Sequence, residues 1–496
     1  GARTYDQRYL PDDFDDAGVT WQRLGTYELS SDTLVVTLAN RADGGDLIAD
    51  AVRIQRIEGD RSADDDLHLQ AGSDAIDAGD PLTHWLAEPT PNGERANQGA
   101  YGNTAGAATS PGQFVQMLTP DGREKYELGQ AVDVQWRSSG LTEHRWAGLI
   151  NAGGAVAEPW LYDRYWTDAA WSGAGGFSNA VDRSGVTNPA PEAVYQTYRY
   201  ANNVIGATMG YHLPVSDGDY TVRLHFADVY TNVGQRVFDV YLQGALVHDD
   251  YDIRAAAGAP YTATTLSFSV AAAGGQGIAL DLVNETSYQA LVSGIEVYAE
   301  NPDGAAAPTA DLALSVNDGV SYDPVVADVA FDRYGRGGYA WTAGPRTDTN
   351  VARMRVTADA ASAPQDASDE AFLISGDGTD YYVNLAADGD LGDNAYTTAA
   401  GDDANSGKSP DAPMAHLQAL LGAYDLGGGD TVYVDTGTYV LPVDVAIGAG
   451  DAGVTLQGPT GPGQEAVFDR ANTASGRYAF DLRDADGTTL SYLTLT

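Results

Sequence analysis

The sequence predicts an all-β protein of several domains. Its 58 glycines and 29 tyrosines, together with abundant valine and threonine, favour strands and tight turns over helices. One convincing helix is expected at about 411–425, where Pro410 and Pro413 stand near the start and three glycines, 427–429, follow the end. At 496 residues the chain is too long for one hydrophobic core, so we expect three to five domains.

The composition is strongly acidic. Twenty-seven basic side chains oppose 70 acidic ones, which gives a net charge of −43, and there is no cysteine. The electrostatic field of this negative charge repels nucleic acid and anionic membranes, so neither is an expected partner. The sequence contains no run of 18 apolar residues, so we expect no membrane insertion. The charge suits an extracellular, salt-rich or calcium-containing medium, and a halophilic soluble protein is the plainest interpretation. Without cysteine, disulfides, thiol catalysis and zinc–thiolate sites are excluded.

The first segment, residues 1–58, holds the strings WQRLGTYEL and IADAVRIQRI beside alternating apolar patterns at 33–38 and 49–57. It resembles the last half of a golvesin C-terminal-like β-sandwich. The resemblance implies that Trp21 and Asp50 serve the core and the strand register. We therefore expect this segment to be structural.

Residues 59–110 carry short apolar pairs between glycine and aspartate corners, in LHLQAGSDAIDAGDP and PNGERANQGAYGNT. Such corners let each short strand turn sharply into the next one. These strings resemble the closing rungs of a right-handed parallel β-helix of the kind found in bacterial secreted proteins. We therefore expect this segment to end a β-helix.

The string SPGQFVQMLTPDGREKYELGQAVDVQWRSSGL, at residues 110–141, resembles the first strands of an immunoglobulin-like domain. The strand patterns that would complete such a domain occur only at about 311–374. We infer one immunoglobulin-like domain split into 111–144 and 305–375. A second domain would then be inserted at an exposed loop, where insertion costs little if the inserted termini lie close together. Two separate small domains flanking the middle segment are the alternative.

The middle segment, residues 145–300, shows the clearest strand pattern. Tyr220, Val222, Leu224 and Phe226 alternate with polar residues, which predicts a half-buried strand. The strings YQTYRY, GYHLPVSDGDYTVRLHFADVYTNVGQRVFDVYLQG and SGIEV resemble malectin along the whole segment. The resemblance implies a β-sandwich with loops at its ends that bind short glucose-type or related glycans.

The same resemblance implies which side chains bind the sugar. Aromatic rings suit the faces of pyranoses, and polar neighbours fix the hydroxyl groups. The candidate carbohydrate-binding residues are Tyr162, Tyr165, Trp166, Trp171, Tyr230, Asn232, Tyr288 and Gln289. The sequence departs from animal malectin at Thr231, where an aromatic residue is expected, and it lacks the carboxylate expected near the last strand. Tight packing of the loops is the alternative role for these aromatic side chains.

Residues 380–496 contain GDDANSGKSPDAPMAHLQALLGAY and GGGDTVYVDTGTYVL, which resemble the N-terminal cap and first rungs of a parallel β-helix. Met414, Leu417, Leu420 and Leu421 fall on one face of the expected helix, which would cover the open end of the core. The end of one β-helix thus precedes the start of another. This order predicts a slice through an array, formed by covalent tandem repeats or by head-to-tail self-association.

Motifs for catalysis are missing from the sequence. The seven histidines are scattered without metal-ligand spacing, and no serine-nucleophile elbow or phosphate-binding glycine loop occurs. Asp435, Asp444, Asp469 and Arg470 could stand on β-helix rungs, but nothing in the sequence separates them from corner residues. We therefore expect no enzyme.

One acidic loop is a candidate calcium site. Asp388, Asp390 and Asp393 bring hard oxygen ligands together within six residues. A solvated acidic loop is the alternative, in keeping with the acidity of the whole chain. No other cofactor is expected.

These patterns together predict a non-catalytic segment of an extracellular surface protein, of the adhesin or filament-forming type, whose malectin-like module binds a glycan. One alternative is an accessory part of a secreted polysaccharide-degrading β-helix enzyme. Another is a malectin-like fold that serves only as a spacer or protein-contact module.

Overall fold

The computed structural model describes residues 14–16, 19–25, 36, 52–54, 66–167, 172–347, 350–471 and 477–496. The chain divides into two units, 1–49 and 50–496. In the first unit, β1 (Phe14–Asp16) and β2 (Val19–Trp21) pair as an antiparallel hairpin. Most of the segment that resembles golvesin, Asp50 included, lies outside the described residues.

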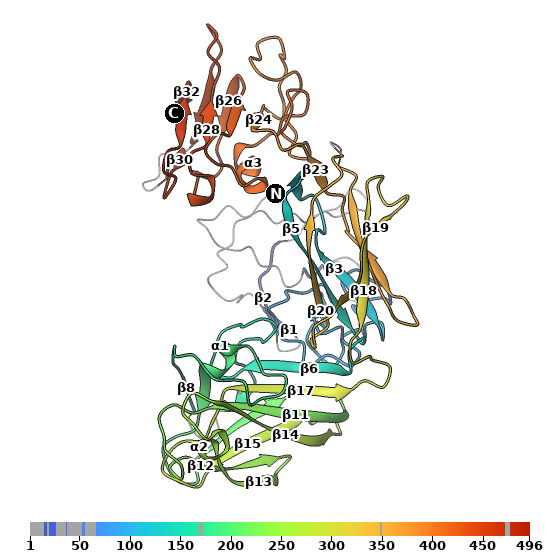
Figure 1. The fold of residues 1–496 in the computed structure, drawn as a ribbon, viewed down its shortest axis with the longest axis vertical. Helices are drawn as coiled ribbons and strands as arrows, with labels where there is room; N and C mark the ends of the chain where they lie inside the picture. The colour runs from blue at the N-terminus through green and yellow to red at the C-terminus, as the bar shows by residue number, and fades with distance from the viewer. Residues whose placement is uncertain are drawn as a thin grey trace. The chain divides into compact units, whose positions relative to one another are not determined.

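The middle of the chain forms a sandwich of two antiparallel sheets (Figure 1). The five-stranded sheet has the order β13 (Ala245–Asp252), β12 (Val237–Leu242), β15 (Ile278–Asn284), β10 (Thr208–Leu213) and β7 (Trp166–Thr167). The four-stranded sheet has the order β14 (Ala263–Ala272), β11 (Gly218–Ala227), β17 (Gly294–Glu300) and β6 (His144–Asn151). A small third sheet has the order β16 (Leu291–Val292), β9 (Thr197–Tyr200) and β8 (Gly173–Gly176). Two short helices accompany these sheets, α1 (Glu192–Tyr195) and α2 (Ile253–Ala257).

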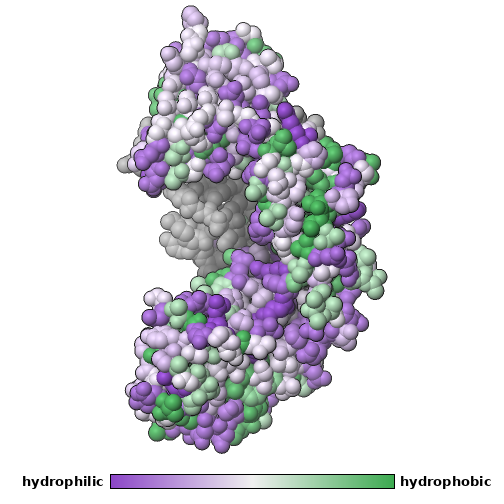
Figure 2. Space-filling view, in the orientation of Figure 1, coloured by the Kyte–Doolittle hydropathy of each residue, from purple (hydrophilic) through white to green (hydrophobic). Residues whose placement is uncertain are grey.

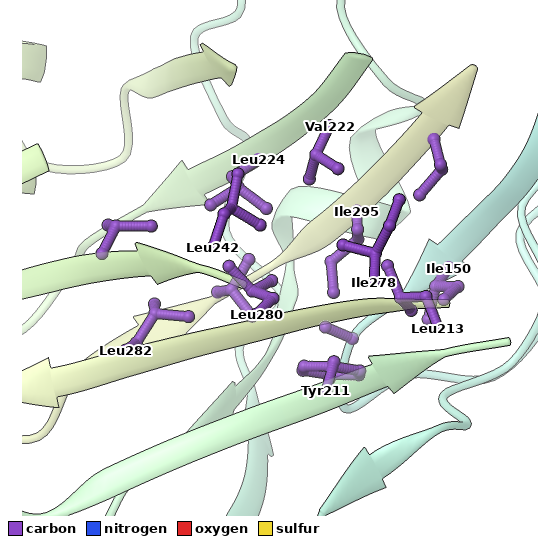
Figure 3. Close-up of a cluster of buried hydrophobic side chains, with 14 of the residues drawn as sticks. Ile150, Tyr211, Leu213, Val222, Leu224, Leu242, Ile278, Leu280, Leu282 and Ile295 are labelled. Carbon is purple, nitrogen blue, oxygen red and sulfur yellow. The ribbon is translucent and has the colours of Figure 1, made fainter. Parts of the chain in front are cut away.

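Apolar side chains fill the space between the two larger sheets (Figure 3). Val222, Leu224 and Ile295 of the four-stranded sheet belong to one buried cluster with Leu242 and Leu280 of the five-stranded sheet. This is the alternation that the sequence predicts for β11, and the strand is confirmed. The hydrophobic effect of this core holds both sheets in place and leaves the loops at the sandwich ends to carry function.

Two stretches on either side of the sandwich share a second core. Strands β3 (Phe114–Thr119), β4 (Lys125–Glu127) and β5 (Ala131–Ser139) precede the sandwich, and β5 pairs with β20 (Arg336–Thr342), which follows it. The other strands are β18 (Thr309–Ser315), β19 (Asp323–Ala330), β21 (Arg353–Ala358), β22 (Gln365–Ala367) and β23 (Leu373–Ser375). Their common core includes Trp136 and Phe372. We call this part the flanking sandwich.

The last part of the chain consists of parallel ladders. One ladder has the order β24 (Asp380–Val383), β25 (Thr431–Val434), β28 (Thr455–Gln457) and β31 (Thr489–Ser491). The second has the order β26 (Gly437–Val440), β29 (Ala466–Asp469) and β32 (Leu493–Leu495), and the third pairs β27 (Val445–Ala446) with β30 (Phe480–Asp481). A 3-10 turn, η1 (Ala449–Asp451), lies between strands.

The predicted helix at 411–425 is shorter in the structure, where α3 covers Leu417–Ala423. Residues 411–416 instead form a turn and bends, with an isolated parallel β-bridge between Met414 and Val383. The N–H of Met414 donates to the carbonyl of Tyr382, and the Met414 carbonyl accepts from Asn384, at 3.0 Å each. These bonds to the first parallel strand satisfy the backbone groups that a longer helix would have used.

The described residues of the 66–110 segment form turns and bends without a strand, and the assignment of this segment to the closing rungs of a β-helix stays a prediction. Its Trp85 packs with Leu161, and its Leu86 joins the core of the central sandwich. Across the described parts of the chain, the α-helices are α1 to α3, each of seven residues or fewer, which confirms the all-β prediction. None of these helices is long and apolar enough to cross a membrane.

Candidate functional site

Three loops of the central sandwich, 202–206, 228–236 and 284–290, are tied together by hydrogen bonds. The buried amide of Asn284 donates to the carbonyls of Asn202 and Val204, at 2.7 and 3.0 Å. The hydroxyl of Thr286 donates to the carbonyl of Gln235 at 2.7 Å. The three loops therefore form one surface rather than three independent segments.

A buried ion pair fixes the loop at 228–236. The Arg236 Nε lies 2.8 Å from Oδ2 of Asp228, and the side chains are 5% and 0% exposed. Asp228 also accepts hydrogen bonds from the hydroxyl of Thr231 and the backbone N–H of Tyr230. Burial alone would raise the pKa of Asp228, but the Arg236 charge and these hydrogen bonds lower it. Tyr230 remains 62% exposed at the tip of this anchored loop.

Two tyrosines of β9 lie beside the same loop, over glycines of β8. Tyr198 pairs with Gly175 and Tyr200 pairs with Gly173, and the two rings are 5.9 Å apart between centroids. A Cβ on Gly175 would stand 2.8 Å from Cζ of Tyr198, so only glycine leaves room for the ring. Burial and the neighbouring hydroxyl of Tyr230 raise the pKa of Tyr198 to about 12. We call Tyr198, Tyr200, Tyr230 and Tyr288 the aromatic loop cluster.

Four of the predicted sugar-binding residues lie on these loops. Tyr230 and Tyr288 are exposed, Tyr288 by 39%. The carbonyl of Gln289 accepts a hydrogen bond from Arg236, so its backbone helps to anchor the site. Asn232 is exposed, and both its backbone and its side-chain N–H groups contact Oε1 of Gln235.

Three other predicted residues have different partners. Tyr162 and Tyr165 make edge-on contacts with the ring of His84, at 4.8 and 5.1 Å between centroids. Burial lowers the pKa of His84 to about 4, which keeps this ring neutral. Trp166 lies under the guanidinium of Arg199, whose Cζ is 4.1 Å from the ring centroid. Trp171 lies outside the described residues.

Sequence reasoning missed Tyr198, Tyr200, Asp228 and Arg236 as parts of the site. A signal for the tyrosines was present, because the alternating glycines of 173–176 match the alternating tyrosines of the next strand. The role of Arg236 depends on a partner eight residues earlier, and no local periodicity reveals it.

The candidate calcium loop forms hydrogen bonds of its own. Oδ2 of Asp388 accepts from the amides of Asn384 and Asn394 at 2.8 Å each, and Oδ1 accepts from the N–H of Asp390 at 3.1 Å. Burial opposes the effect, but these bonds lower the pKa of Asp388. Among described residues, acidic oxygens gather within 4.8 Å in two other places: Asp239, Asp249 and Asp250, and Asp311, Asp328 and Asp359. Asp388, Asp390 and Asp393 do not form such a group.

The central part of the chain is thus an antiparallel β-sandwich with aromatic side chains on end loops that hydrogen bonds join. Residues 148–302 match the family model described as the malectin domain. The predicted malectin-like part of the chain is thereby confirmed.

Several relatives are plant proteins. A probable receptor-like protein kinase of Arabidopsis thaliana is 28% identical over 214 residues, which are 37% of this chain and 26% of that protein. A probable LRR receptor-like serine/threonine-protein kinase of the same plant is 32% identical over 112 residues, or 21% of this chain and 10% of that protein. The chain therefore spans about a quarter or less of these relatives.

Solved structures with a similar part include the ANX2 ectodomain from Arabidopsis thaliana, with 19% identity and a TM-score of 0.27. Another is a chain from the crystal structure of plant peptide RALF23 in complex with FER and LLG2, with 22% identity and a TM-score of 0.28. Each match covers 36% of this chain and 54% of the other.

Proposed function

We propose that the malectin domain binds a neutral glycan through the aromatic loop cluster. The observation that carries this proposal is the exposure of Tyr230 on a loop that the buried Asp228–Arg236 pair anchors. Exposed rings offer flat apolar faces on which the C–H groups of a pyranose can stack. A loop that is already ordered loses little entropy when it binds. The net charge of −43 disfavours acidic sugars.

A peptide is the second candidate ligand. Val204, Ile205 and Val233 are 56%, 65% and 66% exposed on the same joined loops. Exposed apolar side chains suit an apolar peptide better than a sugar. Figure 2 shows that hydrophobic side chains also occur among hydrophilic ones elsewhere on one face of the molecule. This candidate also accommodates a module that serves only for protein contact.

An array of neutral oligosaccharides, followed by calorimetry on the strongest ligand, tests the proposal. We expect Tyr230→Ala to abolish most of the binding. Tyr492→Ala is the matched control, because Tyr492 is similarly exposed, at 68%, but lies among the parallel ladders. Binding to a peptide library without binding to any glycan would favour the second candidate.

For the whole chain we propose a non-catalytic role in an extracellular surface or filament-forming protein. The flanking sandwich would be the split immunoglobulin-like domain, and 380–496 the cap and first rungs of a parallel β-helix. Three sheets with parallel pairing and a helix whose Leu417, Leu420 and Leu421 join their core support the latter assignment. The acidic, cysteine-free composition favours an exterior medium.

Electron microscopy of the native material tests the filament hypothesis. A regular axial repeat is the expected result, with head-to-tail self-association or tandem repeats as its source. Isolated particles would contradict it and would favour the alternative of an accessory part of a secreted polysaccharide-degrading enzyme.

A further inference from the structure

A loop of the flanking sandwich inserts two side chains into the malectin domain. Arg333, between β19 and β20, forms an ion pair with Oε1 of Glu296, whose side chain on β17 is 0% exposed. The carbonyl of Arg333 accepts a hydrogen bond from Nε1 of Trp146 at 3.1 Å. The hydroxyl of the next residue, Tyr334, accepts one from Nε1 of Trp160 at 3.1 Å. The loop therefore satisfies polar groups that the malectin domain itself leaves buried.

The inserted loop is shaped for this contact. Oδ1 of Asp332 accepts from the backbone N–H groups of Tyr334 and Arg336, at 2.8 and 2.9 Å. Gly335 has a φ of +73°, a left-handed conformation that favours glycine. The ring of Tyr334 packs against a buried cluster of the malectin domain, with its centroid 5.1 Å from that of Trp146. The flanking sandwich thus completes this part of the malectin core.

Glu296 contacts Arg333 and also two residues of β11, His225 and Arg223. Its Oε1 lies 3.5 Å from Nε2 of His225, and Nδ1 of His225 lies 2.7 Å from the hydroxyl of Tyr195. Its Oε2 lies 3.5 Å from Nη1 of Arg223. His225 and Glu296 are fully buried, so every charge in this group depends on its partners.

Two residues of this network, His225 and Tyr195, lie close in sequence to residues of the candidate site. His225 lies on β11, three residues before Asp228, the anchor of the exposed loop. Tyr195 ends α1, three residues before Tyr198. Contacts from Glu296 through His225 to Tyr195 therefore connect it to the segments that lead to Asp228 and to Tyr198.

We propose that Arg333 is a positioning residue for the aromatic loop cluster. By neutralising buried Glu296, it holds His225 and Tyr195, and with them the starts of both ligand-carrying segments, in one arrangement. The effect on ligand affinity rests on the proposed function, whereas the effect on the network does not. The malectin domain then depends on the flanking sandwich for its binding geometry.

The test compares Arg333→Met with Arg336→Met in the full chain. Arg336, the first residue of β20, forms an exposed pair with Glu158, with side chains 42% and 64% exposed, and is the matched control. We expect Arg333→Met to weaken binding of the strongest array glycan by about threefold to thirtyfold, the range of typical coupling changes. Arg336→Met should leave the affinity unchanged. Adding Glu296→Gln to Arg333→Met removes the unpaired charge and should restore much of the affinity.

NMR titration of the histidine rings gives a readout that a merely structural role would not move. The charged and titratable groups around His225 are Tyr195, Glu296, Arg223 and Arg333. Because burial and the positive charge of Arg333 lower the pKa of His225, losing that charge should raise this pKa. His225→Gln assigns the resonance.

Fluorotyrosine spectra report the cluster directly, with the signal of Tyr230 assigned by Tyr230→Phe. A shifted Tyr230 signal in Arg333→Met is the expected result even if no glycan binds, a case in which only the proposed function fails. Unchanged Tyr230 and His225 signals in Arg333→Met, with or without a loss of stability, would overturn the inference. Unchanged affinity for a glycan that wild type binds would overturn it as well.

Discussion

The Nε of Arg236 lies 2.8 Å from Oδ2 of Asp228, and both atoms belong to buried side chains. A second buried pair joins Asp163 to Arg199, which lies on β9 between Tyr198 and Tyr200, and these side chains are 8% and 9% exposed. Both pairs fix the backbone next to aromatic rings. In this acidic chain, buried arginine side chains thus hold the segments that carry the aromatic loop cluster.

Replacing Arg236 by methionine should destabilise the 228–236 loop strongly. The substitution leaves Asp228 buried without its counter-ion, which costs about 3–5 kcal/mol for a pair of this kind. Amide hydrogen exchange of residues 228–242 measures the local opening free energy. The control is Arg123→Met, because Arg123 and Glu370 form an exposed pair at 3.6 Å, and such pairs contribute about 0–1 kcal/mol. Equal exchange in both variants would contradict the anchoring role.

Replacing Gly175 by alanine should weaken ligand binding without unfolding the domain. The new Cβ would stand 2.8 Å from Cζ of Tyr198, so the ring must leave its place over β8. Gly185→Ala is the matched control, because a Cβ at Gly185 meets nothing within 4 Å. Calorimetry with the strongest glycan and thermal unfolding separate the two effects. Unchanged affinity in Gly175→Ala would remove Tyr198 from the binding surface.

The sandwich could be predicted from local pattern because its strands alternate. Val222, Leu224 and Phe226 point into the core as expected, since burial of every second side chain is a property of a strand itself. The position of Tyr230 in an exposed loop also follows from the malectin resemblance. These features depend on residues close together in the sequence.

The missed features depend on distant partners. Tyr162 and Tyr165 contact His84, which stands 78 residues before Tyr162, so nothing near them in the sequence shows that they face another segment. Glu296 similarly finds Arg333 on a different domain. The sequence shows which side chains are present, but the fold determines which of them are buried in contact with each other.

Stability should fall as pH rises through the range in which Glu88 titrates. Burial raises the pKa of Glu88 to about 7, although N–H groups of Asn103 and Asn97 oppose the shift. In the unfolded chain its pKa is about 4.3. The folded pKa is the higher one, so the stabilising contribution of protonated Glu88 is complete below pH ~4.3 and is lost as pH rises toward about 7.

Glu88→Gln removes this titration. The free energy of unfolding of the variant, relative to wild type, should therefore increase between pH 4 and pH 8, by up to about 3 kcal/mol. Chemical unfolding of both proteins at both pH values measures this difference in unfolding free energy. The other carboxylates titrate in both proteins, so their contributions cancel in the difference. Glu370→Gln, at a side chain 60% exposed, should show no such change. Parallel pH profiles for Glu88→Gln and wild type would contradict the assignment.

Asp435, which follows β25, is one of the carboxylates that the enzyme alternative could use, and both of its oxygens accept hydrogen bonds. Oδ1 accepts from the N–H groups of Ala395 and Thr436, at 2.6 and 2.7 Å. Oδ2 accepts from the N–H groups of Tyr396 and Thr397, at 3.0 and 2.6 Å, and from the Thr397 hydroxyl at 2.7 Å. A carboxylate with five donors has no lone pair left for general acid or base chemistry.

Asp435→Asn should therefore unfold the surroundings of β25 locally. The new amide group cannot accept the bonds of one oxygen, and each buried donor left without a partner costs about 1–3 kcal/mol. Hydrogen exchange of residues 395–397 and 431–436 should become faster, while Asp444→Asn, at a half-buried position on the same ladders, leaves it unchanged. A different result would make Asp435 catalytic and contradict the structural assignment. In that case Asp435→Asn would keep full protection from hydrogen exchange but would lose a polysaccharide-cleaving activity that the wild-type protein shows.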